Sequence, residues 1–171
     1  MKRLTLIALF FGLVLQTFAQ DKEKIKAAAT ISANAFAKGD YNTLADHTYP
    51  KLLATIGGKK TFIQTVSMAM SQLKNQGMSF AKVVVGNPGE IYPAGTELDC
   101  LVPETITLKF QGKYMTTTTY LLAISPDKGK TWYFADTGSN SPEKLKQLQP
   151  NYNPKLVIPQ TSQPVFSDNI P

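Results

Sequence analysis

The stretch YLLAISPDKGKTWYFADTG, residues 120–138, decides the fold. It contains two runs rich in apolar, β-branched and aromatic residues, 120–124 and 131–136, on either side of a short polar segment. Asp127 can hydrogen-bond the loop backbone, and Gly129 can adopt a positive φ. The stretch therefore predicts an antiparallel hairpin.

The centre of this stretch, Ser125 to Trp132, also fits the S-x-D-x-G-x-T-W pattern of the Asp-box found in sialidases and related propeller proteins. Propeller blades take on the order of 40 to 50 residues each, and the motif recurs around the ring. This chain of 171 residues holds one copy. Because the motif is itself a hairpin device away from the sialidase active site, we interpret it as a turn and expect no glycoside hydrolysis.

Further runs of the same kind precede the hairpin, at residues 83–85, 105–110 and 114–124, with Gly, Pro and Asn between them. In one of these runs Ile106 and Leu108 alternate with polar residues, so their side chains share one face of a strand. The later half of the chain thus predicts a meander of antiparallel strands. We expect the apolar face of that meander to meet the helices.

The first half of the chain has the spacing of amphipathic helices. Residues 21–38 form the first, which Gly39 ends as a C-cap. Asp40 caps a second helix, within which Pro50 predicts a kink or a restart. A third spans about residues 60–75. Three N-terminal helices followed by strands predict an α+β domain with the helices packed on a curved antiparallel sheet.

The two ends of the chain differ from this domain. Lys2 and Arg3 precede an apolar stretch at residues 4–15, which predicts a signal peptide cut between Ala19 and Gln20. The apolar stretch is shorter than the roughly 20 residues of a spanning helix, so we expect no stable membrane anchor. We therefore expect export to the periplasm or the medium. The predicted organisation is a signal peptide (1–19), one domain (20–149) with a short helix at 141–148, and a Pro-rich C-terminal tail (150–171).

Composition excludes several classes of function. The formal net charge of +6 falls to near +4 without Lys2 and Arg3. The basic residues are spread along the chain and form no Lys/Arg cluster, so we expect no binding to nucleic acid. Cys100 is the only cysteine, so no internal disulfide can form; its alternating apolar neighbours indicate a buried small hydrophobe. One His, one Cys and scattered carboxylates offer no spaced ligand set. We expect no metal and no cofactor.

The order and lengths of these elements, with KGDYNTLADHTYPKLLATIGGKK at residues 38–60 and the hairpin at 120–138, resemble the nuclear transport factor 2 like (cystatin-like cone) superfamily. The resemblance covers roughly residues 21–148. It implies a cone-shaped α+β barrel with an apolar pocket, and dimers formed through the sheet. Members include steroid isomerases, dehydratases, polyketide cyclases and non-catalytic binding domains, so the fold does not fix the function.

The resemblance also implies where to look for a site. Enzymes of this fold use a carboxylate or His base inside the pocket, with a Tyr or a protonated Asp as oxyanion donor. Candidates for the catalytic roles are His47, Asp46, Tyr49 and Tyr120, with Asp99 a further candidate by residue type. Candidates for the ligand pocket are Tyr92, Thr117, Thr119 and Asp136. The alternatives stay open: His47 as a core residue, Asp136 as a turn cap, and the threonines as a solvated edge.

Two functions fit these observations. The first is an exported, non-catalytic module that binds a small apolar ligand or a protein partner, and a homodimer is one of the partners expected. The second is a small isomerase- or dehydratase-like enzyme acting on a small organic substrate, since an Asp, a His and a Tyr lie within four residues at 46–49. The missing acid/base constellation favours the first function.

Overall fold

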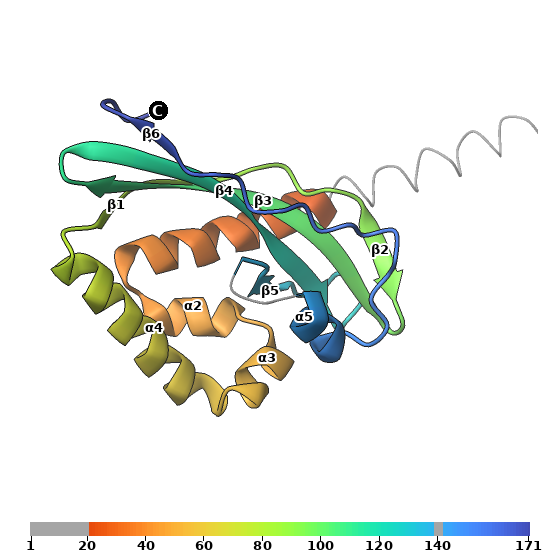
Figure 1. Ribbon diagram of the computed structural model, residues 1–171. Helices are drawn as coiled ribbons and strands as arrows, with labels where there is room; N and C mark the ends of the chain where they lie inside the picture. Colours follow the sequence, from red (N-terminus) through yellow and green to blue (C-terminus); the bar gives the residue numbers. More distant parts are fainter. Residues whose placement is uncertain (1–20, 139–141) are drawn as a thin grey trace, which may run out of the picture.

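The computed structural model describes residues 21–138 and 142–171, so the predicted signal peptide and its cleavage site lie outside the described residues. Within these ranges the chain forms helices followed by a six-stranded antiparallel sheet (Figure 1), which is the α+β class predicted from the sequence. None of the helices in the described ranges is long and apolar enough to span a membrane.

The N-terminal helices begin and end close to the residues predicted from the sequence. The first helix occupies residues 21–38 and is followed by α2 (Tyr41–His47), α3 (Pro50–Thr55) and α4 (Gly58–Asn75). The Asp40 carboxylate caps α2 by accepting hydrogen bonds from the Thr43 amide at 3.1 Å and the Thr43 hydroxyl at 2.7 Å. Pro50 begins α3. The second predicted helix is therefore divided in two, and four helices rather than three precede the sheet in the described ranges.

A long central hairpin organises the sheet. The strands are β1 (Ser79–Val85), β2 (Ile91–Ala94), β3 (Glu97–Phe110), β4 (Lys113–Ser125), β5 (Tyr133–Asp136) and β6 (Val165–Ser167). β3 pairs with β4 along nearly their whole length, β1 and β2 pair with β3, and β5 and β6 pair with β4. β1 and β5 end the strand order without pairing with each other, so the sheet is open and is not the closed barrel that the resemblance implies.

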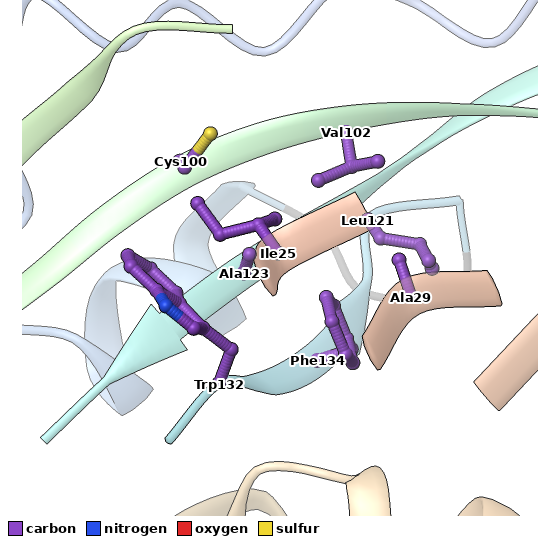
Figure 2. Close-up of a cluster of buried hydrophobic side chains, with 8 residues drawn as sticks. All are labelled: Ile25, Ala29, Cys100, Val102, Leu121, Ala123, Trp132 and Phe134. Atoms are coloured by element: carbon purple, nitrogen blue, oxygen red, sulfur yellow. The ribbon is translucent and has the colours of Figure 1, made fainter. Parts of the chain in front are cut away.

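One face of the sheet, called the inner face below, packs against the first helix. The register pairs Cys100 with Ala123 and Val102 with Leu121, which places these side chains on the same face. They belong to a buried hydrophobic cluster (Figure 2) made of Ile25, Ala29, Cys100, Val102, Leu121, Ala123, Trp132 and Phe134. Cys100 is fully buried there, as predicted. Burial raises the pKa of its thiol to about 12.

The opposite face, called the outer face, is covered by α5 (Pro142–Leu148) and by the segment after it. Leu122 and Ile124 alternate with the inner-face residues of β4 and pack in a second cluster with Leu145 of α5 and Leu156. The segment then continues along the sheet to β6, where residues 165–167 pair with β4. The Pro-rich tail is therefore docked on the sheet.

The hairpin loop confirms that the Asp-box pattern is a turn. The Ser125 hydroxyl donates to the Asp127 carboxylate and accepts from the Gly129 amide, both at 2.8 Å. The same carboxylate accepts from the Thr131 amide at 2.8 Å. Gly129 has φ of 87°, as the turn requires, and Trp132 is buried in the inner cluster.

Candidate functional site

The candidates predicted on α2 and the following turn do not form one site. His47 is half-buried, and its Nδ1 atom lies 2.9 Å from the backbone oxygen of Thr43, one turn earlier. Asp46 is exposed and forms a salt bridge with Lys59 at 2.5 Å. Tyr49 is buried and faces a different element. Three neighbours in sequence thus have three separate sets of contacts, and no base and donor meet here.

The remaining aromatic candidates and Thr117 are also separated. Tyr92 on β2 donates from its hydroxyl to Glu90 at 3.2 Å, near an edge of the sheet. Tyr120 on β4 alternates with Leu121 and so belongs to the outer face. Thr117 lies opposite Ile106 on the inner face. These positions are spread over both faces of the sheet.

Tyr49 belongs to a polar network that joins α3 to the start of β3. Its hydroxyl donates to both carboxylate oxygens of Glu97, at 2.9 and 3.1 Å, and Lys51 donates to the same oxygens at 3.3 Å. Burial would raise the pKa of Glu97, but contacts with Gln149, Tyr49 and Lys51 together outweigh it and lower the pKa. Glu97 is therefore a charged, well-paired anchor.

Asp99, two residues along β3, is fully buried beside this network. The Gln149 amide donates to its Oδ1 atom at 3.0 Å, which links β3 to the chain after α5. Its Oδ2 atom has no hydrogen-bond partner among the described residues. Burial raises the pKa of Asp99 to about 6, against the lowering effect of the Gln149 bond. Asp99 is thus a desolvated acid whose hydrogen bond with Gln149 ties the sheet to the segment that follows α5.

A second buried acid lies on the inner face. Glu104 on β3 is only 6 % exposed and stands opposite Thr119 on β4. Asp136 on β5 is two residues from Phe134 and so shares the same face. Burial, and then the charge of Asp136, raise the pKa of Glu104 to about 7. We call Glu104, Asp136 and Thr119 the inner acid site.

The contacts of the inner acid site are incomplete. Asp136 accepts a hydrogen bond from the Gly138 amide at 3.1 Å, the contact expected of the turn-cap alternative. The hydroxyl oxygen of Thr119 is buried without a hydrogen-bond partner in the described ranges. No hydrogen bond to the Glu104 carboxylate is found within those ranges either. A carboxylate that titrates near neutrality beside an unpaired hydroxyl can exchange a proton.

The structure also contains a small hollow on the outer side of the fold. It has a volume of about 160 Å³ and lies between α5 and the segment after it. Its lining residues are Leu145, Lys146, Tyr152, Leu156 and Ile158. The Tyr152 hydroxyl donates to the Leu156 backbone oxygen, which closes the segment on itself. The hollow offers an apolar wall with one cationic side chain.

Neither the inner acid site nor the hollow was recognised in full from the sequence. Thr119 and Asp136 were predicted as pocket residues, and the structure brings them together with Glu104, which was not. The signal that could have identified Glu104 in the sequence is its charge at a position that alternates with the apolar, inward-facing residues of the strand. Within the described ranges, no three His, Cys, Asp or Glu side chains gather as metal ligands would. Comparison with known protein families, curated proteins and solved structures finds no match for this chain.

Proposed function

We propose that this chain is an exported, non-catalytic binding module of the nuclear transport factor 2 like superfamily, and that it holds an apolar group in the hollow beside α5. Helices that pack on an antiparallel sheet support the family. The signal-peptide pattern at Lys2, Arg3 and the apolar stretch supports export. The observation that carries the binding function is the hollow itself, because its walls are preformed and mostly apolar.

The size of the hollow limits its occupant. The hollow is partly open to solvent, so its volume of about 160 Å³ lets the apolar wall contact one ring or one short branched chain without enclosing it. Even full burial of such a group would contribute only roughly 1.5–3 kcal/mol. A Kd of 1 mM requires about 4 kcal/mol, so the ligand must make at least one further contact outside the apolar wall.

A hollow-filling variant tests this function. In Ile158→Trp the new ring replaces a lining side chain and occupies the space, whereas Val157→Trp adds the same ring at a neighbour that is 75 % exposed. We expect a single-ring probe, phenylacetamide, to shift the NMR signals of Tyr152 and Leu145 in the wild type and in Val157→Trp, and not in Ile158→Trp. Circular dichroism checks that both variants fold.

Native mass spectrometry of the purified full chain supplies an independent readout. With phenylacetamide added to the chain, we expect an adduct of one probe mass in the wild type and in Val157→Trp that is absent in Ile158→Trp. The proposal fails if the probe leaves the signals around the hollow unchanged, or if Ile158→Trp binds it as the wild type does.

A second candidate function is the isomerase- or dehydratase-like enzyme, and the inner acid site is the observation that favours it. With a pKa of about 7, Glu104 suits a base that removes a proton beside a carbonyl, and the Thr119 hydroxyl could donate to the developing oxyanion. Deuterium exchange at the carbon beside the carbonyl, followed by NMR over a panel of cyclic ketones, is the test. Exchange should vanish in Glu104→Gln and persist in Glu23→Gln, an exposed residue of the first helix; equal rates in both variants would exclude Glu104 as the base.

A further inference from the structure

The charge at the hollow comes from one side chain. Lys146 lies in the last turn of α5 and is exposed at the hollow, whose other lining residues are uncharged. It forms no salt bridge with any residue of the described ranges. Its ammonium is therefore free to pair with a bound group.

An acidic side chain, Asp99, also influences a lining residue of the hollow electrostatically, but it is not exposed to solvent. Burial, and then the charge of Asp99, raise the pKa of Tyr152 to about 12, so Asp99 acts electrostatically on one lining residue. Asp99 is fully buried, and Gln149 holds one of its carboxylate oxygens. The charged side chain that lines the hollow is thus Lys146, which is exposed, whereas Asp99 is buried within the protein.

We infer that the hollow binds a small apolar anion, a carboxylate on a single ring or on a short branched chain. The apolar part lies against Tyr152 and Leu156, and the carboxylate accepts hydrogen bonds from the Lys146 ammonium at the opening. This assignment rests on the proposed binding function and adds the ligand class to it. It also supplies the further contact that the small apolar surface requires.

Three probes of one size separate charge from shape. Phenylacetate, phenylacetamide and phenethylamine carry the same ring with a negative, neutral or positive group. In NMR titrations of the full chain we expect phenylacetate to bind roughly two- to fivefold more tightly than phenylacetamide, as an exposed ion pair allows, with phenethylamine weakest. The preference should shrink in high salt, because ions screen exposed charges.

A pair of lysine variants locates the effect. Lys146→Met keeps the apolar stem and removes the charge, and it should abolish the preference for phenylacetate while phenylacetamide binds as before. Lys155→Met is the matched control, because Lys155 is exposed on the same segment and does not line the hollow. It should keep the preference.

The outcomes distinguish this inference from the function on which it rests. Equal binding of the three probes at the hollow, or an unchanged preference in Lys146→Met, refutes the anion assignment and leaves the binding function standing. If none of the probes shifts the signals of the lining residues in the wild type, both fail.

Discussion

Glu104→Gln probes the energetic cost of the inner acid site. Glu104 is 6 % exposed and faces Thr119 across the central hairpin. Burial, and then the charge of Asp136, raise its pKa from 4.5 to about 7. Because the folded pKa exceeds the unfolded value, the native state holds the proton more tightly. The resulting stability is fully present below about pH 4.5 and is lost as the pH rises through about 7.

The size of this effect follows from the pKa difference. Each pKa unit corresponds to about 1.4 kcal/mol, so full ionisation of Glu104 costs about 3.5 kcal/mol, of which about 2.5 kcal/mol develops between about pH 5 and pH 8. Glutamine has no proton to lose in this range. The free energy of unfolding of Glu104→Gln should therefore fall less with rising pH than that of the wild type, by about 2–3 kcal/mol over the interval.

Urea denaturation followed by circular dichroism, at intervals between about pH 5 and pH 8, measures the difference. With a slope of roughly 1–3 kcal/mol per molar urea, the gap between the two midpoints should change by about 1 M or more. Asp99 titrates in both proteins and cancels in the comparison. Glu23→Gln, at an exposed position, should follow the wild type. Parallel pH profiles for Glu104→Gln and the wild type would refute the reasoning.

Further predictions address the other polar and packing contacts. Asp127→Ala removes two hydrogen bonds from the hairpin turn and should lower the free energy of unfolding by about 1–3 kcal/mol in urea melts; an unchanged midpoint would contradict the structural interpretation of the turn. Tyr49→Phe leaves the Glu97 carboxylate with fewer donors and should cost about 1–2 kcal/mol and raise the pKa of Glu97 in an NMR titration. The fully buried Cys100 should react with a thiol reagent only after unfolding, and rapid labelling of the native protein would exclude its burial. Leu156→Ala should cost about 2–4 kcal/mol and speed proteolysis of the C-terminal segment, which a protease time course would show or contradict.

The parts of the fold that follow local rules could be predicted from the sequence. The hairpin at Asp127 and Gly129 requires a particular backbone geometry, and those residue types supply it. Pro50 removes a backbone donor, which restarts the helix where the pattern indicated. In both cases the residues that determine the local structure lie within a few positions of it, so the sequence alone is sufficient to predict it.

Elements stabilised by distant partners could not be predicted. β2 contains Pro93 and forms only as an edge strand along β3. β6 pairs with β4 near the far end of the chain and has no period of its own that marks a strand. The same holds for the Tyr49–Glu97 contact, whose members lie 48 positions apart in sequence. Their partners are visible only in three dimensions.

The two buried acids of β3 show how structure separates an anchoring role from a functional one. Asp99 accepts a hydrogen bond from Gln149, which links β3 to the segment after α5. This contact offsets part of the free-energy cost of burying the Asp99 carboxyl group. Glu104 has no such donor in the described ranges, although its place in the alternation of Cys100, Val102 and Ile106 calls for an apolar residue. A buried carboxylate without a donor among the described residues costs stability when it ionises, and this cost is the observation on which the enzyme candidate rests. If Glu104→Gln is more stable than the wild type at pH 8, the enzyme candidate keeps its support; if it is less stable, Glu104 anchors the fold and the enzyme candidate loses its main support.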